Sequence, residues 1–327
     1  MKKLYTVVLF ILFLAGSTTY GQDPHFSQFY ANPLYLNPAF AGTSLCPRLI
    51  LNFRDQWPSI AGTYVTYNAS YDQHIEKISG GIGVLLNTDR AGQGILNTTN
   101  ISVMYSYRLE VNRKFSMRAA IEATYFQKSL DWQKLTFGDQ IDPRHGFVFN
   151  TNELQPSKLT KSNIDFSAGA LGYGENYFVG FAVNHLTEPD EGFISKSRMQ
   201  RRYTIHAGGV INLVKKVRRR SNEHIPTLSP NILFMQQGNS QEINYGIYFN
   251  RYPFVGGMWF RQNFKNSDAV VFMVGIHASM FKIGYSYDLT VSKLTNATGG
   301  AHEVSFALQF NCKPPNKRVR AINCPSF

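Results

Sequence analysis

Apolar and polar residues alternate with a period of two along most of the chain, from residue 48 onward. Between residues 243 and 250, for example, Ile243, Tyr245 and Ile247 are separated by polar or small residues. Successive side chains of a β-strand point to opposite faces of a sheet. The alternation therefore predicts strands that each carry one apolar and one polar face.

The alternating segments are each about ten residues long and are bounded by Gly, Asn, Asp or Pro. They cover residues 48–56, 63–73, 79–87, 97–108, 114–126, 162–174, 176–185, 202–213, 228–236, 241–250, 253–262, 268–277, 279–288 and 302–311. An even number of such segments is typical of single-chain bacterial outer-membrane barrels. We predict an all-β fold, a transmembrane antiparallel β-barrel of about 14 strands that occupies residues 48–311.

The predicted connections have unequal lengths, and short periplasmic turns with long external loops are typical of such barrels. If the barrel begins in the periplasm, the long connections 127–161, 186–201 and 289–301 lie outside the cell. The long connection 214–227, with the basic run KKVRRR at 215–220, is an exception because it falls on the periplasmic side. We expect a multi-pass outer-membrane protein with both termini in the periplasm.

The first residues have the three parts of a secretory signal peptide. Lys2 and Lys3 precede an apolar run from Leu4 to Ala15, and small and polar residues follow as far as Gly21. An uncleaved membrane anchor is the weaker alternative, because the run is shorter than the ~20 residues that span a bilayer. We expect residues 1–21 to be removed and the mature chain to begin at Gln22.

Composition and charge agree with an exported membrane barrel. Aromatic residues make up 14% of the chain and charged residues only 17%, whereas about 25% of residues in soluble domains are charged. The net charge of +12 gathers in clusters at 196–202, 215–220 and 313–320. An exported chain rarely meets nucleic acid, so we expect no nucleic-acid partner and assign these clusters to solvated loops, acidic partners or the headgroups of outer-membrane lipid.

The alternation places a set of charged residues on the face opposite the lipid, which we expect to line the lumen. The set comprises Arg54, Arg108, Arg118, Glu122, Asp165, Arg261, Lys282 and Asp288. Glu122 and Asp165 could serve as paired catalytic carboxylates, but hydrated ion pairs inside a barrel explain them more simply. No nucleophile, metal or nucleotide motif occurs and the histidines are scattered, so we expect no catalytic residues, no metal and no cofactor.

Three cysteines, Cys46, Cys312 and Cys324, lie near the ends of the chain. Cys46 precedes the first predicted strand and Cys312 follows the last, and these two strands are neighbours when a barrel closes. A disulfide between Cys46 and Cys312 is one prediction for this exported protein. The alternatives are that Cys324 takes part instead or that no pair forms.

The segment 22–47 before the barrel has a different character. In residues 22–42, three prolines and two Asn-Pro pairs oppose regular structure. Five aromatic residues nevertheless call for burial, namely Phe26, Phe29, Tyr30, Tyr35 and Phe40. We predict either a plug inside the lumen or an arm that binds a partner through these aromatic residues. Residues 312–327 form a basic tail that is expected in the periplasm.

The segment QDPHFSQFYANPLYLNPAFAG, directly after a signal peptide, resembles the start of the PorP/SprF family of type IX secretion-associated outer-membrane proteins from Bacteroidetes. The resemblance continues in order along the chain. Its further motifs are NFRDQWP at 52–58, GGIG at 80–83, DRAGQG at 89–94, YSY at 105–107, NHL at 184–186, GGMWFR at 256–261, IGYSYD at 283–288 and the ending CPSF.

The resemblance implies a barrel that works with type IX secretion components. Such proteins support export or surface attachment of a large secreted cell-surface protein, for example a gliding adhesin. The family pattern includes no catalytic residues, so the resemblance favours a non-enzyme. The alternative function is an outer-membrane channel for hydrophobic or small solutes.

Overall fold

The structure is a computed structural model that describes residues 21–44, 46–60, 62–112, 114–214, 225–264, 267–291 and 299–312. Several expectations fall outside these residues. They concern the signal peptide up to residue 20, the basic run 215–220, Cys324 and nearly all of the tail 312–327.

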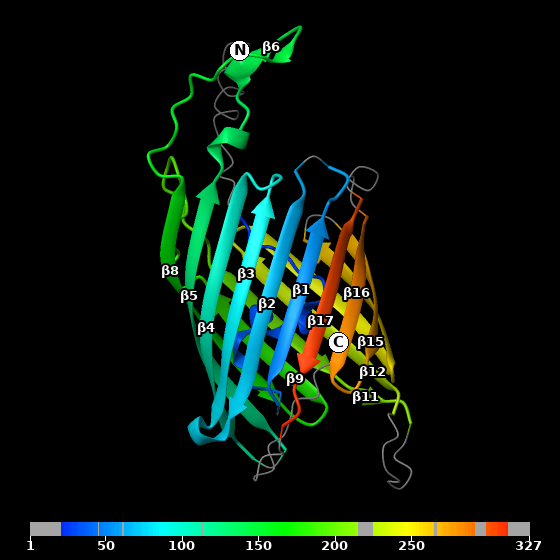
Figure 1. The fold of residues 1–327 in the computed structure, drawn as a ribbon. Helices are drawn as coiled ribbons and strands as arrows, with labels where there is room; N and C mark the ends of the chain where they lie inside the picture. The colour runs from blue at the N-terminus through cyan, green and yellow to red at the C-terminus, as the bar shows by residue number, and fades with distance from the viewer. Residues whose placement is uncertain are drawn as a thin grey trace, which may run out of the picture.

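Fourteen long antiparallel strands of the described chain form a closed barrel (Figure 1). They are β1 (Arg48–Gln56), β2 (Tyr64–Ile75), β3 (Gly80–Ala91), β4 (Leu96–Glu110), β5 (Ser116–Leu130), β8 (Thr160–Tyr173), β9 (Tyr177–Asn184), β10 (Arg202–Gly209), β12 (Thr227–Gln237), β13 (Ser240–Arg251), β14 (Phe254–Asn263), β15 (Ser267–His277), β16 (Phe281–Thr290) and β17 (Ala301–Gln309). Each strand pairs with the next along the chain, and β1 pairs with β17. The predicted all-β barrel is confirmed.

The alternation seen in the sequence becomes an inside and an outside. In β16, Phe281, Ile283 and Tyr285 are 41–45% exposed on the outer face. Ser286 and Asp288, from the other set of alternate positions, are 0% and 3% exposed. An apolar outer face and a polar inner face are what a barrel in lipid requires, because lipid cannot hydrate polar groups.

The strand bounds differ from the predicted ones at several ends, and β3 continues to Ala91, four residues beyond the predicted segment 79–87. β5 continues to Leu130, four residues beyond the predicted segment 114–126. The predicted strand 202–213 is interrupted, because β10 ends at Gly209 and a two-residue strand, β11 (Ile211–Asn212), follows. The connection after β5 contains the single-turn helices η4 (Trp132–Lys134) and η5 (Gly138–Gln140) and a small hairpin of β6 (Ile141–Asp142) and β7 (Gly146–Phe147).

The two ends of the barrel are unlike one another. The loop rim is the end where β1, β5 and β9 finish and where the long connections 131–159 and 185–201 lie. In Figure 1 it is the upper end, from which the green β6–β7 hairpin projects. The turn rim is the opposite end of the barrel. β1 and β3 begin there, and β4 ends there.

Residues 22–44 form a plug inside the barrel. The plug contains three short helices, η1 (Phe29–Ala31), α2 (Pro33–Leu36) and η2 (Pro38–Phe40). Proline is tolerated at the first turn of a helix, where its missing N–H would have no partner. The side chain of Asn37 accepts a hydrogen bond from the backbone N–H of Ala39 at 2.9 Å, which caps η2. The prolines and asparagines thus produce a compact chain of single turns.

The plug crosses the lumen once, from the loop rim to the turn rim. Asp23 contacts Arg202 and Gln237 at the loop rim, whereas Gly42 lies against Asp72 near the turn rim. The two ends of the described chain, residues 21 and 312, are therefore at opposite rims. The expectation of both termini at one end does not include this extra crossing, because a segment without periodicity carries no signal for its direction.

A disulfide joins Cys46 to Cys312, with their Cα atoms 5.5 Å apart. It lies at the turn rim beside the pair of β1 and β17, where Arg48 is opposite Gln309. The disulfide connects the end of the plug to the residues that follow the last strand. It therefore reinforces the seam at which the first and last strands close the barrel.

We expect Cys46→Ser to lower the free energy of unfolding by about 2–4 kcal/mol, because the disulfide restricts the unfolded chain. Guanidinium unfolding in detergent, followed by loss of the heat-resistant electrophoretic form, measures the change. Cys312→Ser and the double variant should give the same loss, and a reducing agent should reproduce it in the native chain. An additive loss in the double variant would contradict a bond between these two residues.

Candidate functional site

The plug buries its aromatic residues against the inner wall. Phe26, Phe29, Tyr30 and Phe40 are 1–6% exposed, and Tyr35 is partly buried. Burying one such side chain stabilises its position by about 1.5–3 kcal/mol. All five residues predicted to bind a partner thus make their contacts within the chain.

These aromatic residues meet one side of the barrel. The ring of Phe29 lies 5.3 Å from that of Trp259 on β14, and the ring of Tyr30 lies 5.5 Å from Phe178 on β9. Phe40 stacks on His206 of β10 at 5.3 Å. Edge and stacked contacts of this kind add to the stabilisation that burial itself gives.

The wall formed by β1 to β4 carries a row of amide side chains on its inner face. Asn52, Asn68, Asn87 and Asn100 lie directly opposite one another across these four strands. The first three are 1–4% exposed. Leu85 of β3 and Met104 of β4 add apolar side chains to this wall, and they belong to the same buried core cluster as Leu34 of the plug. The aromatic partners of the plug rings lie on β9, β10 and β14.

A network of buried charges, here called the Ser27 cluster, holds the first half of the plug. The Ser27 hydroxyl donates to Asp288 at 2.5 Å and accepts from Arg54 at 2.8 Å and from Arg261 at 2.7 Å. Glu303 accepts from the backbone N–H of Ser27 at 2.7 Å.

The Ser27 cluster is balanced, with two guanidinium groups and two carboxylates. Arg54 bonds both Asp288 at 3.0 Å and Glu303 at 3.2 Å, and Arg261 bonds Asp288 at 3.1 Å. These four side chains are at most 5% exposed. Buried charges require both a partner and further hydrogen bonds, and here the plug supplies hydrogen bonds to all four.

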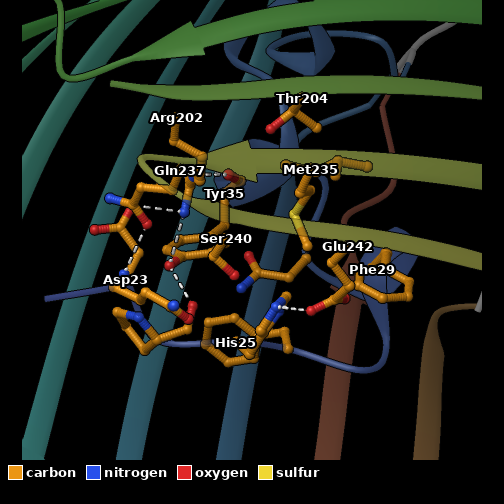
Figure 2. A pocket seen from close by; sticks show the side chains of 15 residues that line it. Asp23, His25, Phe29, Tyr35, Arg202, Thr204, Met235, Gln237, Ser240 and Glu242 are labelled. Atoms are coloured by element: carbon orange, nitrogen blue, oxygen red, sulfur yellow. Dashed lines mark hydrogen bonds and ion pairs between the residues drawn. The ribbon is translucent and has the colours of Figure 1, made fainter. Parts of the chain in front are cut away.

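A second set of contacts, the rim latch, fixes the start of the plug at the loop rim. It consists of Asp23, Asp165, His185 and Arg202. Asp23 bonds Nε2 of His185 at 2.8 Å and Arg202 at 2.8 Å (Figure 2 shows Asp23 and Arg202). Nδ1 of His185 bonds Asp165 at 2.7 Å. An imidazole that faces a carboxylate at each nitrogen must donate from both, so the geometry requires the protonated form.

The electrostatics of the rim latch agree with that geometry. His185 lies just beyond β9, outside the membrane-spanning strands. Burial by itself would lower the pKa of His185, but the charge of Asp23 and the hydrogen bonds to Asp165 and Asp23 raise that pKa to about 9. Burial likewise favours the neutral form of Asp23, and the charges of His185 and Arg202 hold its pKa well below the usual range.

The end of the plug is held at the turn rim by backbone contacts. Arg118 donates to the carbonyl oxygens of Ala41 and Gly42, each at 2.7 Å. Asp72 accepts from the N–H of Gly42 at 2.9 Å. Gly42 has a φ of +67°, and a Cβ there would lie 2.5 Å from the Cα of Gly81 on β3. Only glycine allows the plug to approach the wall this closely.

The eight charged residues predicted for the lumen occupy separate places on its wall. Arg54, Arg261 and Asp288 come together in the Ser27 cluster, whereas Arg118 and Asp165 hold the two ends of the plug. Arg108 pairs with Glu110 near the turn rim. Glu122 is 5% exposed and accepts from Thr124 at 3.3 Å. Lys282 is partly buried, in the same alternate set as Asp288.

Sequence reasoning missed several residues that hold the plug. Glu303 shares its alternate positions with Ser305, so the strand pattern could have found it. Arg202 and His206 are likewise on the inner face of a predicted strand. Asp23 and Ser27 lie outside the predicted strands, where no periodicity marks a side chain as inward. His185 ends the predicted strand 176–185, in the alternate set that faces outward. The partners of these three residues emerge only from the path of the plug.

Within the described part of the chain, no group of three or more His, Cys, Asp or Glu side chains is arranged to hold a metal ion. None of the helices among these residues has the length and apolar character needed to cross a membrane.

A closed barrel with an apolar outer face and a plugged lumen defines a β-barrel membrane protein. The family described as Type IX secretion system membrane protein PorP/SprF matches residues 18–308. The chain belongs to this family. The resemblance drawn from the sequence is thereby confirmed, and the family is one of membrane proteins rather than enzymes.

Solved structures with a similar fold share little sequence with this chain. The toluene transporter TbuX of Ralstonia pickettii is 10% identical, over 85% of this chain and 93% of its own, with a TM-score of 0.49. A deletion mutant of the monoaromatic hydrocarbon channel TodX is 12% identical, over 85% and 94% of the two chains, with a TM-score of 0.46. A mutant porin of Rh. blastica is 8% identical, over 82% and 99%, with a TM-score of 0.34. No curated protein matches the chain by sequence.

The double variant Arg54→Met/Arg261→Met should release the first half of the plug. Asp288 and Glu303 would lose their cations, and breaking buried pairs in this way costs about 3–5 kcal/mol. We expect the variant to conduct ions in planar bilayers with a preference for cations, while the plugged native barrel conducts poorly. Arg90→Met removes an exposed charge and serves as the matched control. A double variant as closed as the native barrel would show that the cluster does not hold the plug.

The rim latch should weaken as the pH rises. The pKa of His185 is raised from 6.5 to about 9 in the folded protein, so its contribution is complete below pH 6.5 and is lost as the pH passes about 9. A spin label on Gln22→Cys should become more mobile between pH 7 and pH 10, a range of about 3 units around this transition. In His185→Gln the label should be mobile throughout the range. If the label stays immobile at high pH in the chain that retains His185, this role for His185 is excluded.

Proposed function

We propose that this barrel is an outer-membrane partner of the type IX secretion system. In this role it supports the export or surface attachment of a large secreted cell-surface protein, such as a gliding adhesin. Membership of the PorP/SprF family supports the link to type IX secretion. The observation that carries the proposal is the filled lumen, because it leaves the rims and loops as the surfaces that can meet a partner.

The proposed orientation has the loop rim outside the cell and the turn rim in the periplasm. Long external loops and short periplasmic turns are typical of bacterial barrels. The position of the Cys46–Cys312 disulfide at the turn rim fits an oxidising periplasm. In this orientation Cys312, the last described residue, lies on the periplasmic side, and the start of the plug faces outward.

Large apolar side chains on the loop-rim connections fit contact with a protein. Phe147, Phe149 and Leu154 are 60%, 55% and 90% exposed in the connection after β5. Ile194 is 84% exposed in the connection after β9. Exposed apolar groups that lie beyond the lipid and outside any core commonly mark protein–protein contact sites.

A solute channel is the competing function, and the plug argues against it. Plug residues 26–34 are all buried, and the Ser27 cluster ties them to four strands of the wall. A channel would need the plug to leave or to shift. Single-channel recording separates the two functions, because a passive channel would conduct without any change to Arg54 or Arg261.

Deletion of the gene should remove at least one large secreted protein from the cell surface. Quantitative mass spectrometry of surface-exposed proteins, compared with complemented cells, measures the loss. Substituting Phe147, Phe149 and Leu154 together by Ser should reduce display of the same protein, because these side chains offer apolar contact area. Phe264→Ser, exposed at another connection of the loop rim, is the control. Unchanged display of every large surface protein in the deletion strain would sink the proposal.

A further inference from the structure

A small pocket opens at the loop rim between the plug and the inner wall. Plug residues 22–26, 29, 32, 35 and 36 form one side of it. Residues of β10, β12 and β13 form the other side, namely Arg202, Thr204, Met235, Gln237, Ser240 and Glu242. Figure 2 shows these two groups of side chains facing one another around the space. We refer to this space as the mouth pocket.

The charged groups that line the mouth pocket are all paired with one another. His25 contacts Glu242 at 2.6 Å, and Asp23 contacts Arg202 at 2.8 Å (Figure 2). Arg202 also lies over the ring of Tyr35, 4.8 Å from its centre. A charged ligand would have to break one of these pairs and be desolvated as well. The pocket therefore favours an uncharged ligand.

Apolar groups supply much of the remaining lining. Phe26 and Phe29 are 2% and 4% exposed, Leu36 is 5% exposed, and the thioether of Met235 faces them from β12. Met side chains adapt their shape and make favourable contacts with aromatic rings. Small polar groups, such as the hydroxyls of Ser240 and Thr204, complete the lining. An apolar pocket with a few polar groups at its edge is the usual form of a ligand site.

The size of the mouth pocket limits what can enter it. Its cavity volume is about 50 Å³, which corresponds to roughly four water molecules. That space suits one large side chain and excludes a folded domain or a long lipid. Further along the plug, Tyr30, Leu34 and Phe40 are 1–6% exposed, so the plug itself is closely packed there.

We propose that the mouth pocket binds a single uncharged apolar or aromatic side chain of the secreted partner and so anchors that partner at the loop rim. This inference rests on the proposed function. Pockets that take one side chain at the centre of an interface commonly contribute most of the binding energy. The exposed apolar residues of the neighbouring loops would surround that anchor. Because the plug forms one wall of the pocket, the bound side chain also contacts the plug directly.

Binding is tested on the full chain in lipid nanodiscs with p-cresol, which has the side chain of tyrosine. Methionine labelled with ¹³C at its methyl group reports the environment of Met235, and a Met235→Leu sample assigns its signal. We expect p-cresol to shift the Met235 signal saturably and to leave the signal of Met273, a buried methionine of β15, unchanged. Propionate and guanidinium, as charged side-chain analogues, should bind at least about tenfold more weakly. Equal binding of the charged analogues, or no saturable shift, would overturn the proposal.

A filled pocket gives the matched test. Ser240→Phe places a ring at the pocket edge, whereas Thr98→Phe adds the same ring to the inner face of the loop rim away from the pocket. We expect Ser240→Phe to weaken p-cresol binding by about tenfold or more, the equivalent of one lost anchor contact. Thr98→Phe should bind normally. The heat-resistant electrophoretic form verifies that both variants are folded. Native affinity in a folded Ser240→Phe variant would place the ligand elsewhere.

The same variants in cells distinguish a partner's side chain from a free small molecule. Ser240→Phe should reduce surface display of the protein that is lost on gene deletion, while Thr98→Phe should not. If deletion depletes a surface protein but Ser240→Phe leaves its display intact, the anchor is wrong and the proposed function stands. If deletion depletes no surface protein, the proposed function fails and the anchor fails with it, and p-cresol binding would then indicate a free aromatic ligand.

Discussion

A barrel of fourteen strands encloses more space than its own wall side chains can fill, whereas about eight strands enclose a space that they can. The plug fills this remaining space. It brings apolar rings to β9, β10 and β14 and hydrogen-bonding groups to the charges beside them. Arg54, Arg261, Asp288 and Glu303 are buried only because the plug covers them, and it supplies hydrogen bonds that water would otherwise provide. The wall and the plug therefore depend on each other.

The barrel was predictable because lipid imposes a regular demand on each strand. Every second side chain must be apolar, so the fourteen strands, the inward position of Arg54 and Asp288 and the closing partners β1 and β17 all follow from a period of two. The plug obeys no such rule. Its prolines and aromatic residues indicated burial, but Ser27 looks like any other serine until its hydroxyl is placed between two guanidinium groups.

The direction of the plug could not be deduced either, since nothing in residues 22–47 distinguishes one rim from the other. The structure resolves it through contacts made by residues distant in sequence. Asp23 meets His185 and Arg202, 162 and 179 residues further along the chain. Gly42 meets Asp72 at the other rim. Long-range pairing of this kind is set by the closed shape of the barrel. A local sequence pattern carries no information about it.

The arrangement of contacts along the plug supports the proposal that a partner is recognised at the loop rim. The middle of the plug is buried and rich in aromatic residues, and its end is fixed by Arg118 and by the close approach of Gly42 to Gly81. Its start is held by the ion pairs of Asp23 with His185 and Arg202, and the pair with His185 weakens as the pH rises. The start is also the part that borders a pocket and lies beside the long loops. In the proposed function, a partner that binds there would contact the part of the plug that these ion pairs hold.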